Sequence, residues 1–163
     1  MFKLPPGWLR RIVPWLLVAL FIALLDQATK VWVESIFVRG ERLPVTSFFN
    51  LVLVYNRGAA FSFLSDAAGW QRYLLVAIAL VAVLLIIGLL AQSSAVGWYR
   101  VSLVLILGGA IGNLWDRITV GEVVDFLDFH LAGWHWPAFN VADSAISVGA
   151  VLLLWDGFFG AKK

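Results

Sequence analysis

Two aspartates, Asp125 in Val-Val-Asp-Phe and Asp143 in Asn-Val-Ala-Asp-Ser, could perform acid–base chemistry in a chain that otherwise avoids charge. A carboxylate at or inside the edge of a bilayer costs roughly 2.5 to 3.5 kcal/mol on insertion scales, so it usually has a partner or a function. Two carboxylates that lie close together cannot both ionise comfortably, and one keeps a proton. The ionised one can activate water while the protonated one polarises a scissile carbonyl. The spacing equally allows an exposed loop acid at Asp125 and a structural hydrogen-bonding residue at Asp143.

Two pairs of polar residues with helical spacing accompany these aspartates. Asp26 and Lys30 are separated by four residues, so they share a helix face and can form an ion pair, either structural or substrate-orienting. Asn113 and Arg117 repeat this spacing at the outer end of another expected helix. They are near enough to anchor a substrate backbone or to balance the charge of the aspartates.

Two asparagines and a glycine complete the set of candidate residues. Asn56 precedes Gly58 after an apolar run, which favours a turn over a substrate contact. Asn140 lies three residues before Asp143 on the same helical face. It can hold the pair of aspartates or cap a buried donor.

Other catalytic chemistries have weaker support. His130 and His135 are five apart without an H-E-x-x-H frame, which argues against a zinc protease. Ser144 has no neighbouring histidine to activate it. A Ser/Lys pair that uses Lys30 stays open, although the adjacent Asp26 disfavours a neutral lysine. The chain has no cysteine, which removes thiolate chemistry and Cys-type metal sites.

The composition is that of an integral membrane protein. Of 163 residues, 62% are hydrophobic and 13% charged, whereas soluble domains average roughly 45 to 50% and about 25%. The net charge of +2 comes from scattered residues without a basic run, which excludes nucleic acid as a partner.

Four apolar segments have the length that a hydrocarbon core of about 30 Å requires. They predict a mainly α membrane protein, a single domain over residues 1–163, with helices over about 12–33, 72–92, 97–115 and 137–156. Tryptophans stand at the expected helix ends, as in interfacial belts. The first segment is too long for the core of a signal peptide, so we interpret it as a retained anchor.

The even number of spans puts both termini on one side, with Lys or Arg clusters at each chain end. This asymmetry favours cytoplasmic termini. The two longer connections, about 34–71 and 116–136, would then be extracytoplasmic.

Residues 48–55 are aromatic and β-branched and predict a strand of a small extracytoplasmic sheet, which 58–64 and 116–136 could extend. Asp125 would lie in the loop before the last helix. Asp143, seven residues after Trp136, would lie about 10 Å into that helix.

Five blocks of residues, in this order, resemble the lipoprotein signal peptidases, or signal peptidase II, bacterial inner-membrane aspartyl proteases. The blocks are Asp26-Gln-Ala-Thr-Lys30, Tyr55-Asn56-Arg57-Gly58-Ala59-Ala60-Phe61, Gly108-Gly-Ala-Ile-Gly-Asn113-Leu-Trp-Asp116-Arg117, Val124-Asp125-Phe126 and Phe139-Asn140-Val-Ala-Asp143-Ser-Ala. Each block alone is a weak signal, but together they are highly specific. The stretch Trp134-His135-Trp136 belongs to none of them.

The resemblance implies cleavage of a prolipoprotein signal peptide before a diacylglyceryl-modified cysteine, near the outer leaflet of the bacterial inner membrane. By the same match, Asp125 and Asp143 are the catalytic pair. The residues that line or support the site are Asp26, Lys30, Asn56, Gly58, Asn113, Arg117, Asn140 and Ala142. We expect the protein to be a monomer that needs neither a metal nor an organic cofactor. Its expected partners are lipid-modified prolipoproteins and membrane lipids.

Two alternatives from other classes remain on sequence alone. A small proton- or ion-coupled transporter could use Asp26, Lys30 and Asp143 as a relay, although no inverted repeat is present. A non-catalytic assembly factor could be held together by the small-residue face at 108–112.

Overall fold

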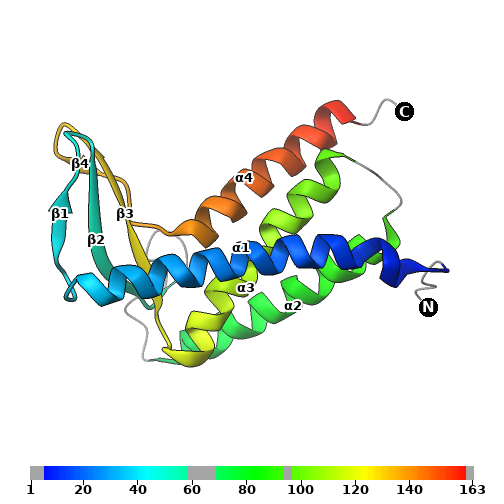
Figure 1. The fold of residues 1–163 in the computed structure, drawn as a ribbon, viewed down its shortest axis with the longest axis horizontal. Helices are drawn as coiled ribbons and strands as arrows, with labels where there is room; N and C mark the ends of the chain where they lie inside the picture. The colour runs from blue at the N-terminus through cyan, green and yellow to red at the C-terminus, as the bar shows by residue number, and fades with distance from the viewer. Residues whose placement is uncertain (1–5, 59–68, 94–96, 161–163) are drawn as a thin grey trace.

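The computed structural model describes residues 6–58, 69–93 and 97–160, which form a helical bundle with a small sheet at one end (Figure 1). Within these ranges, four helices are long and apolar enough to cross a membrane, as expected. They are α1 (Trp8–Ile36), α2 (Trp70–Gln92), α3 (Trp98–Thr119) and α4 (Val141–Trp155), which a π-helical turn, η2 (Asp156–Gly160), continues. A tryptophan begins α1, α2 and α3 and another ends α4, which fits the interfacial belts.

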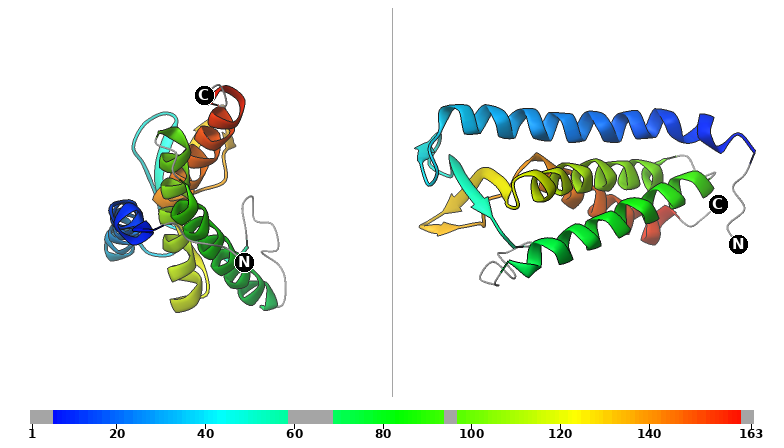
Figure 2. Two further views of the ribbon diagram at one scale, coloured as in Figure 1. Left: turned by 90° about the vertical axis from the view of Figure 1, so that its right-hand side faces the viewer. Right: turned by 90° about the horizontal axis from the view of Figure 1, so that it is seen from below.

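Helix α3 is the centre of the bundle and packs against α1, α2 and α4 (Figure 2). Glycines permit the closest approaches. A Cβ atom at Gly108 would lie 2.7 Å from Ile22 Cβ of α1, and one at Gly109 would overlap the backbone oxygen of Ala142 in α4. The small-residue face of α3 therefore serves helix packing.

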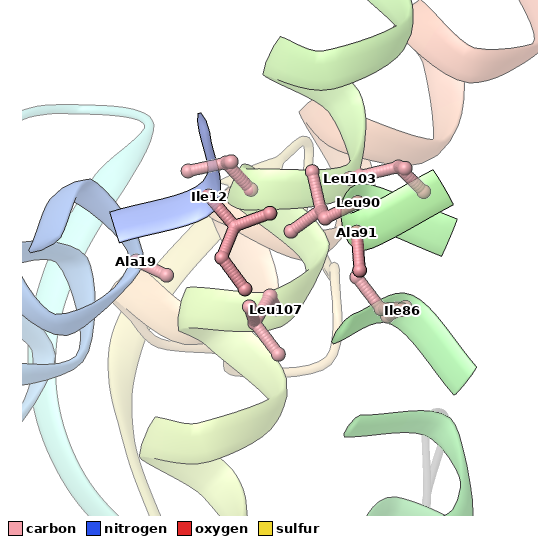
Figure 3. Packing of buried hydrophobic residues seen from close by; sticks show 8 residues of the cluster. Ile12, Ala19, Ile86, Leu90, Ala91, Leu103 and Leu107 are labelled. Carbon is pink, nitrogen blue, oxygen red and sulfur yellow. The ribbon is translucent and has the colours of Figure 1, made fainter. Parts of the chain in front are cut away.

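The apolar core of the bundle lies between α1, α2 and α3, toward the end where α1 begins (Figure 3). Its fully or nearly buried members are Ile12, Ala19, Ile86, Leu90, Ala91, Leu103, Val104 and Leu107. The opposite end of the bundle carries buried aspartates.

The sheet contains four antiparallel strands in the order β1-β2-β3-β4. They are β1 (Arg42–Pro44), β2 (Phe49–Asn56), β3 (Val123–Leu131) and β4 (Trp134–His135). Val33 and Phe37 at the end of α1 pack on Leu53, Val124 and Phe126, which fixes the sheet to the bundle. The strand expected at 48–55 and the contribution of 116–136 are confirmed, whereas residues 59–64 lie outside the described ranges.

Two local expectations were wrong. Asp125 lies in strand β3, paired with Val54, and not in a loop. Helix α4 starts at Val141, four residues later than expected, because Phe139 pairs with Leu127 of β3 in an extended conformation. Asp143 therefore lies in the first turn of α4 and not about 10 Å inside it.

Close packing of α3 on α1 predicts that Gly108→Ala destabilises the protein. The added methyl group would lie 2.8 Å from the backbone oxygen of Ala19, so the helices must separate. We expect a loss of about 1–3 kcal/mol in the free energy of unfolding, as for overpacked cores. Thermal unfolding in detergent micelles measures it.

Gly88→Ala in α2 is the matched control, because a Cβ atom added there would have no atom of the described residues within 4 Å. This change should leave the melting temperature equal or slightly raised, since alanine favours helix over glycine. Equal melting temperatures for both variants would contradict the packing account.

Candidate active site

Asn140 joins the two aspartates that the sequence singled out. Its Nδ2 donates to Asp125 Oδ1 at 2.8 Å, and its Oδ1 accepts from the backbone N–H of Asp143 at 2.8 Å. Asn140 is also the N-cap of α4, where the Asp143 carboxylate accepts from the Asn140 backbone N–H in a capping box. One side chain thus holds strand β3 and helix α4 together at their acidic residues.

Asn113 of α3 fixes the other oxygen of Asp143. Its Nδ2 donates to Asp143 Oδ1 at 2.7 Å, and its Oδ1 accepts from Lys30 Nζ at 3.1 Å. Because an ammonium group only donates, Lys30 determines which end of the Asn113 amide points at Asp143. The side chain of Arg117, the second member of the expected pair, donates to the backbone carbonyl of Asn113 at 3.3 Å.

Lys30 stands at the centre of a buried ion triad. Its Nζ lies 2.7 Å from Asp26 Oδ2 and 2.7 Å from Asp116 Oδ2, and all three side chains are at most 5% exposed. With Asn113, these contacts satisfy all three donors of the ammonium group. The ion pair expected from the spacing of Asp26 and Lys30 is present.

The two carboxylates of the triad reach the neighbours of the paired aspartates. Asp26 Oδ1 accepts from the backbone N–H of Ala142 at 2.8 Å, next to Asp143. Asp116 Oδ2 accepts from the backbone N–H of Val124 at 3.3 Å, next to Asp125. The triad therefore positions both backbones that carry the pair.

Sequence reasoning missed two residues of this network. Asp116 was part of a family block but was not identified as a site residue, although it lies three positions after Asn113 on the same helix face. Gln27 donates to Asp116 Oδ1 at 2.7 Å and to the Gly112 carbonyl at 3.2 Å. No periodic signal identifies Gln27, because its partners are far away in the chain.

Asn56, Gly58 and Arg117 line the side of the site formed by the end of β2. Asn56 Nδ2 donates to Asp125 Oδ2 at 3.2 Å, and its Oδ1 accepts from the Gly58 N–H at 2.9 Å. Arg117 donates to the Gly58 carbonyl at 3.1 Å and to the Asn113 carbonyl at 3.3 Å. Asn56 thus forms the expected turn through its side-chain oxygen and contacts Asp125 through its side-chain nitrogen.

Burial raises the pKa of Asp125 to about 7, and the negative charge of Asp143 adds to this effect. The donors on Asn56 and Asn140 and the charge of Lys30 offset part of it. Asp125 is 2% exposed, so its charged form has little access to solvent. Asp125 therefore keeps its proton to a much higher pH than an ordinary aspartate.

His130 and His135 are not part of this site. His135 Nδ1 lies 2.7 Å from Asp128 Oδ1, and the two imidazole rings stack at 4.8 Å. Within the described ranges, no group of three or more His, Asp or Glu side chains is arranged to hold a metal ion.

Comparison with known proteins identifies the family of the chain. Residues 18–159 match the family model described as signal peptidase (SPase) II. The chain belongs to this family. The signal peptidase II assignment makes it a membrane-spanning peptidase and gives no support to the transporter alternative.

Two similar relatives carry the name lipoprotein signal peptidase. The protein from Paraburkholderia phytofirmans is 58% identical over 145 residues, which are 89% of this chain and 84% of the relative. The protein from a Janthinobacterium species is 55% identical over 145 residues, which are 89% of this chain and 88% of the relative. A solved structure titled as a bacterial membrane enzyme superposes with a TM-score of 0.79 at 30% identity, covering 93% of this chain and 94% of that one.

Removal of the triad's positive charge should destabilise this signal peptidase II strongly. Lys30→Met leaves the carboxylates of Asp26 and Asp116 buried without a counter-charge. We expect the free energy of unfolding to fall by about 3–5 kcal/mol, as when one partner of a buried pair is removed. Chemical unfolding in micelles, followed by circular dichroism, measures it.

Arg39→Met is the control, because Arg39 pairs with Glu122 at 2.8 Å while its side chain is 61% exposed. Exposed pairs contribute about 1 kcal/mol or less. Similar losses for both variants would show that the triad is no more important than a surface ion pair.

Proposed function

We propose that this chain removes the signal peptide from lipid-modified prolipoproteins with an aspartyl pair, Asp125 and Asp143. The names of its relatives support the substrate class. The observation that carries the catalytic assignment is the Asn140 bridge. Asn140 donates to the Asp125 carboxyl group through its side chain and to the Asp143 carboxyl group through its backbone N–H, while burial and the charge of Asp143 raise the pKa of Asp125. Such a pair shares one proton at neutral pH.

The two aspartates have different surroundings and therefore different roles. Asp143 accepts from Asn113 and from the N-terminal backbone of α4, donors that stabilise a carboxylate. It takes a proton from water as the oxygen attacks the scissile carbonyl carbon. Asp125 gives its proton to the carbonyl oxygen, and a tetrahedral gem-diol results.

Collapse of the gem-diol breaks the carbon–nitrogen bond. The proton on Asp143 moves to the leaving amine, and one hydroxyl proton returns to Asp125, so the pair recovers its single proton. The reaction consumes one water molecule and requires no metal ion or redox partner.

The supporting residues divide into two groups by their contacts. Asn113 and Asn140 use both ends of their amides within the network, so we propose that they position the aspartates. Asn56 and Arg117 lie at the open end of β2 beside Gly58. We assign them the contacts with the substrate backbone.

The location follows from the same proposal. The site lies at the sheet end of the bundle, opposite the start of α1 and the end of η2 (Figure 1). With cytoplasmic termini in the bacterial inner membrane, this end faces the outer leaflet. A lipid-modified precursor can then enter the site laterally from the bilayer.

The test of this function is a gel assay with lipidated and unlipidated forms of one prolipoprotein, in membranes with equal enzyme levels. The unchanged enzyme should cleave only the lipidated form. Asp125→Asn and Asp143→Asn should each reduce cleavage by at least roughly a thousandfold, because neither can complete the proton transfers.

Asp156→Asn is the control for these variants, since Asp156 ends the same helix at its far side. It should cleave at the unchanged rate. Wild-type cleavage by either pair variant would refute the catalytic assignment, and equal cleavage of both substrate forms would refute the lipid requirement.

A pKa near 7 for Asp125 predicts how cleavage depends on pH. The active form needs the Asp125 proton, which is lost as the pH rises through about 7. Above about pH 8, kcat/KM should therefore fall about tenfold for each pH unit. Initial rates in micelles from about pH 6 to 9 measure this, and a flat profile over that range would exclude a required proton on Asp125.

A further inference from the structure

The β3–β4 end of the sheet carries a cluster of apolar side chains that the proposed reaction does not use. We call it the aromatic edge, and it consists of Phe48, Phe129, Leu131, Trp134, Trp136 and Phe139. Together with the half-buried His130, these residues line an open hollow of about 520 Å³. Leu131 is 75% and Trp134 62% exposed, so the cluster forms a continuous apolar surface.

Helix α1 indicates the depth of the sheet relative to the bilayer. Its 29 residues span about 43 Å, more than the hydrocarbon core of about 30 Å. Its exposed surface near the sheet carries Trp32, Ile36 and the following Val38 beside the charged Glu34, a mixture that suits the headgroup region. The sheet packs on Val33 and Phe37 of this same segment, so it lies at the level of the lipid headgroups and not far above them.

Chain continuity brings the aromatic edge to the same level. The Trp136 N–H donates to the Phe129 carbonyl, which places this segment along β3. Phe139 pairs with Leu127 and is followed directly by Asn140, the N-cap of α4. The edge therefore lies directly before the first turn of α4 in the chain.

The charged side chains of the sheet lie mainly at the edge opposite the aromatic edge. The opposite edge, at β1, presents Arg39, Glu41 and Arg42, all exposed. Toward β4, the exposed side chains are aromatic or aliphatic, two of them tryptophans, apart from His135, which pairs with the buried Asp128. Tryptophan is the residue that most favours the boundary between acyl chains and headgroups.

We propose that the aromatic edge is a lipid-binding surface that rests in the interface of the surrounding bilayer. Its occupant is the glycerol and upper acyl-chain region of the phospholipids. The bilayer then supports the sheet along the edge opposite β1, and with it the strand that carries Asp125. The lipid contact stands independently of the cleavage reaction, although its importance for the site rests on the proposed function.

A nitroxide label at one cysteine tests this depth, and the natural chain contains no cysteine that would compete for the label. Leu131→Cys reports on the aromatic edge, with Trp134→Cys as a second position if the first variant does not fold. Glu41→Cys at the β1 edge and Leu24→Cys in the middle of α1 are the controls. The labelled proteins are placed in vesicles of phosphatidylcholine and phosphatidylglycerol.

Relaxation of the label by oxygen and by a water-soluble nickel chelate is then compared. At Leu131, the ratio of oxygen to chelate accessibility should lie several-fold above that at Glu41 and below that at Leu24. A ratio equal to that at Glu41 would overturn the proposal. The proposal would also be overturned if the nickel chelate reached the label at Leu131 in vesicles alone and stopped reaching it after a lipidated precursor was added. The aromatic edge would then bind the substrate and not the bilayer. The readout is depth, so it stays valid even if the cleavage proposal fails.

Discussion

The buried positive charge of Lys30 is the constraint on which the other parts of this structure depend. An ammonium group inside a bundle of membrane-spanning helices is tolerated only when carboxylates surround it. Asp26 supplies one from the same helix, and Asp116 supplies the other from α3. Each carboxylate also accepts a hydrogen bond from a backbone N–H. Asp26 accepts from Ala142 in α4, and Asp116 accepts from Val124 in β3. The contacts of this one buried charge thereby bring four elements together, namely α1, α3, α4 and β3.

The proposed catalytic pair, Asp125 and Asp143, is built on this frame. Ala142 and Val124, which the triad holds, each precede one aspartate, and Asn140 then links the two. The site therefore has two layers of opposite character. The inner layer is an ion network in which all three donors of the Lys30 ammonium group are paired, which gives rigidity. The outer layer is left with excess negative charge, and this excess adds to burial in raising the pKa of Asp125.

The sequence predicted those features that arise from local periodicity. Four apolar segments indicated the four helices, and the spacing of Asp26 and Lys30 indicated their ion pair. Features that depend on long-range pairing were missed. Asp116 and Gln27 acquire their roles only when α1 meets α3. The depth of Asp143 was wrong because pairing of Phe139 with Leu127 delays the start of α4, and hydropathy does not report such pairing.

The central claim is that Asp125 carries the shared proton near neutral pH. Infrared spectroscopy of the protein in micelles measures this directly, through the carbonyl stretch of protonated carboxyl groups between about pH 5 and 9. The account predicts a carboxylic acid band that disappears with a midpoint near pH 7 and is absent in Asp125→Asn. The same band with an unchanged midpoint in Asp125→Asn, or no band that titrates in this range, would contradict it.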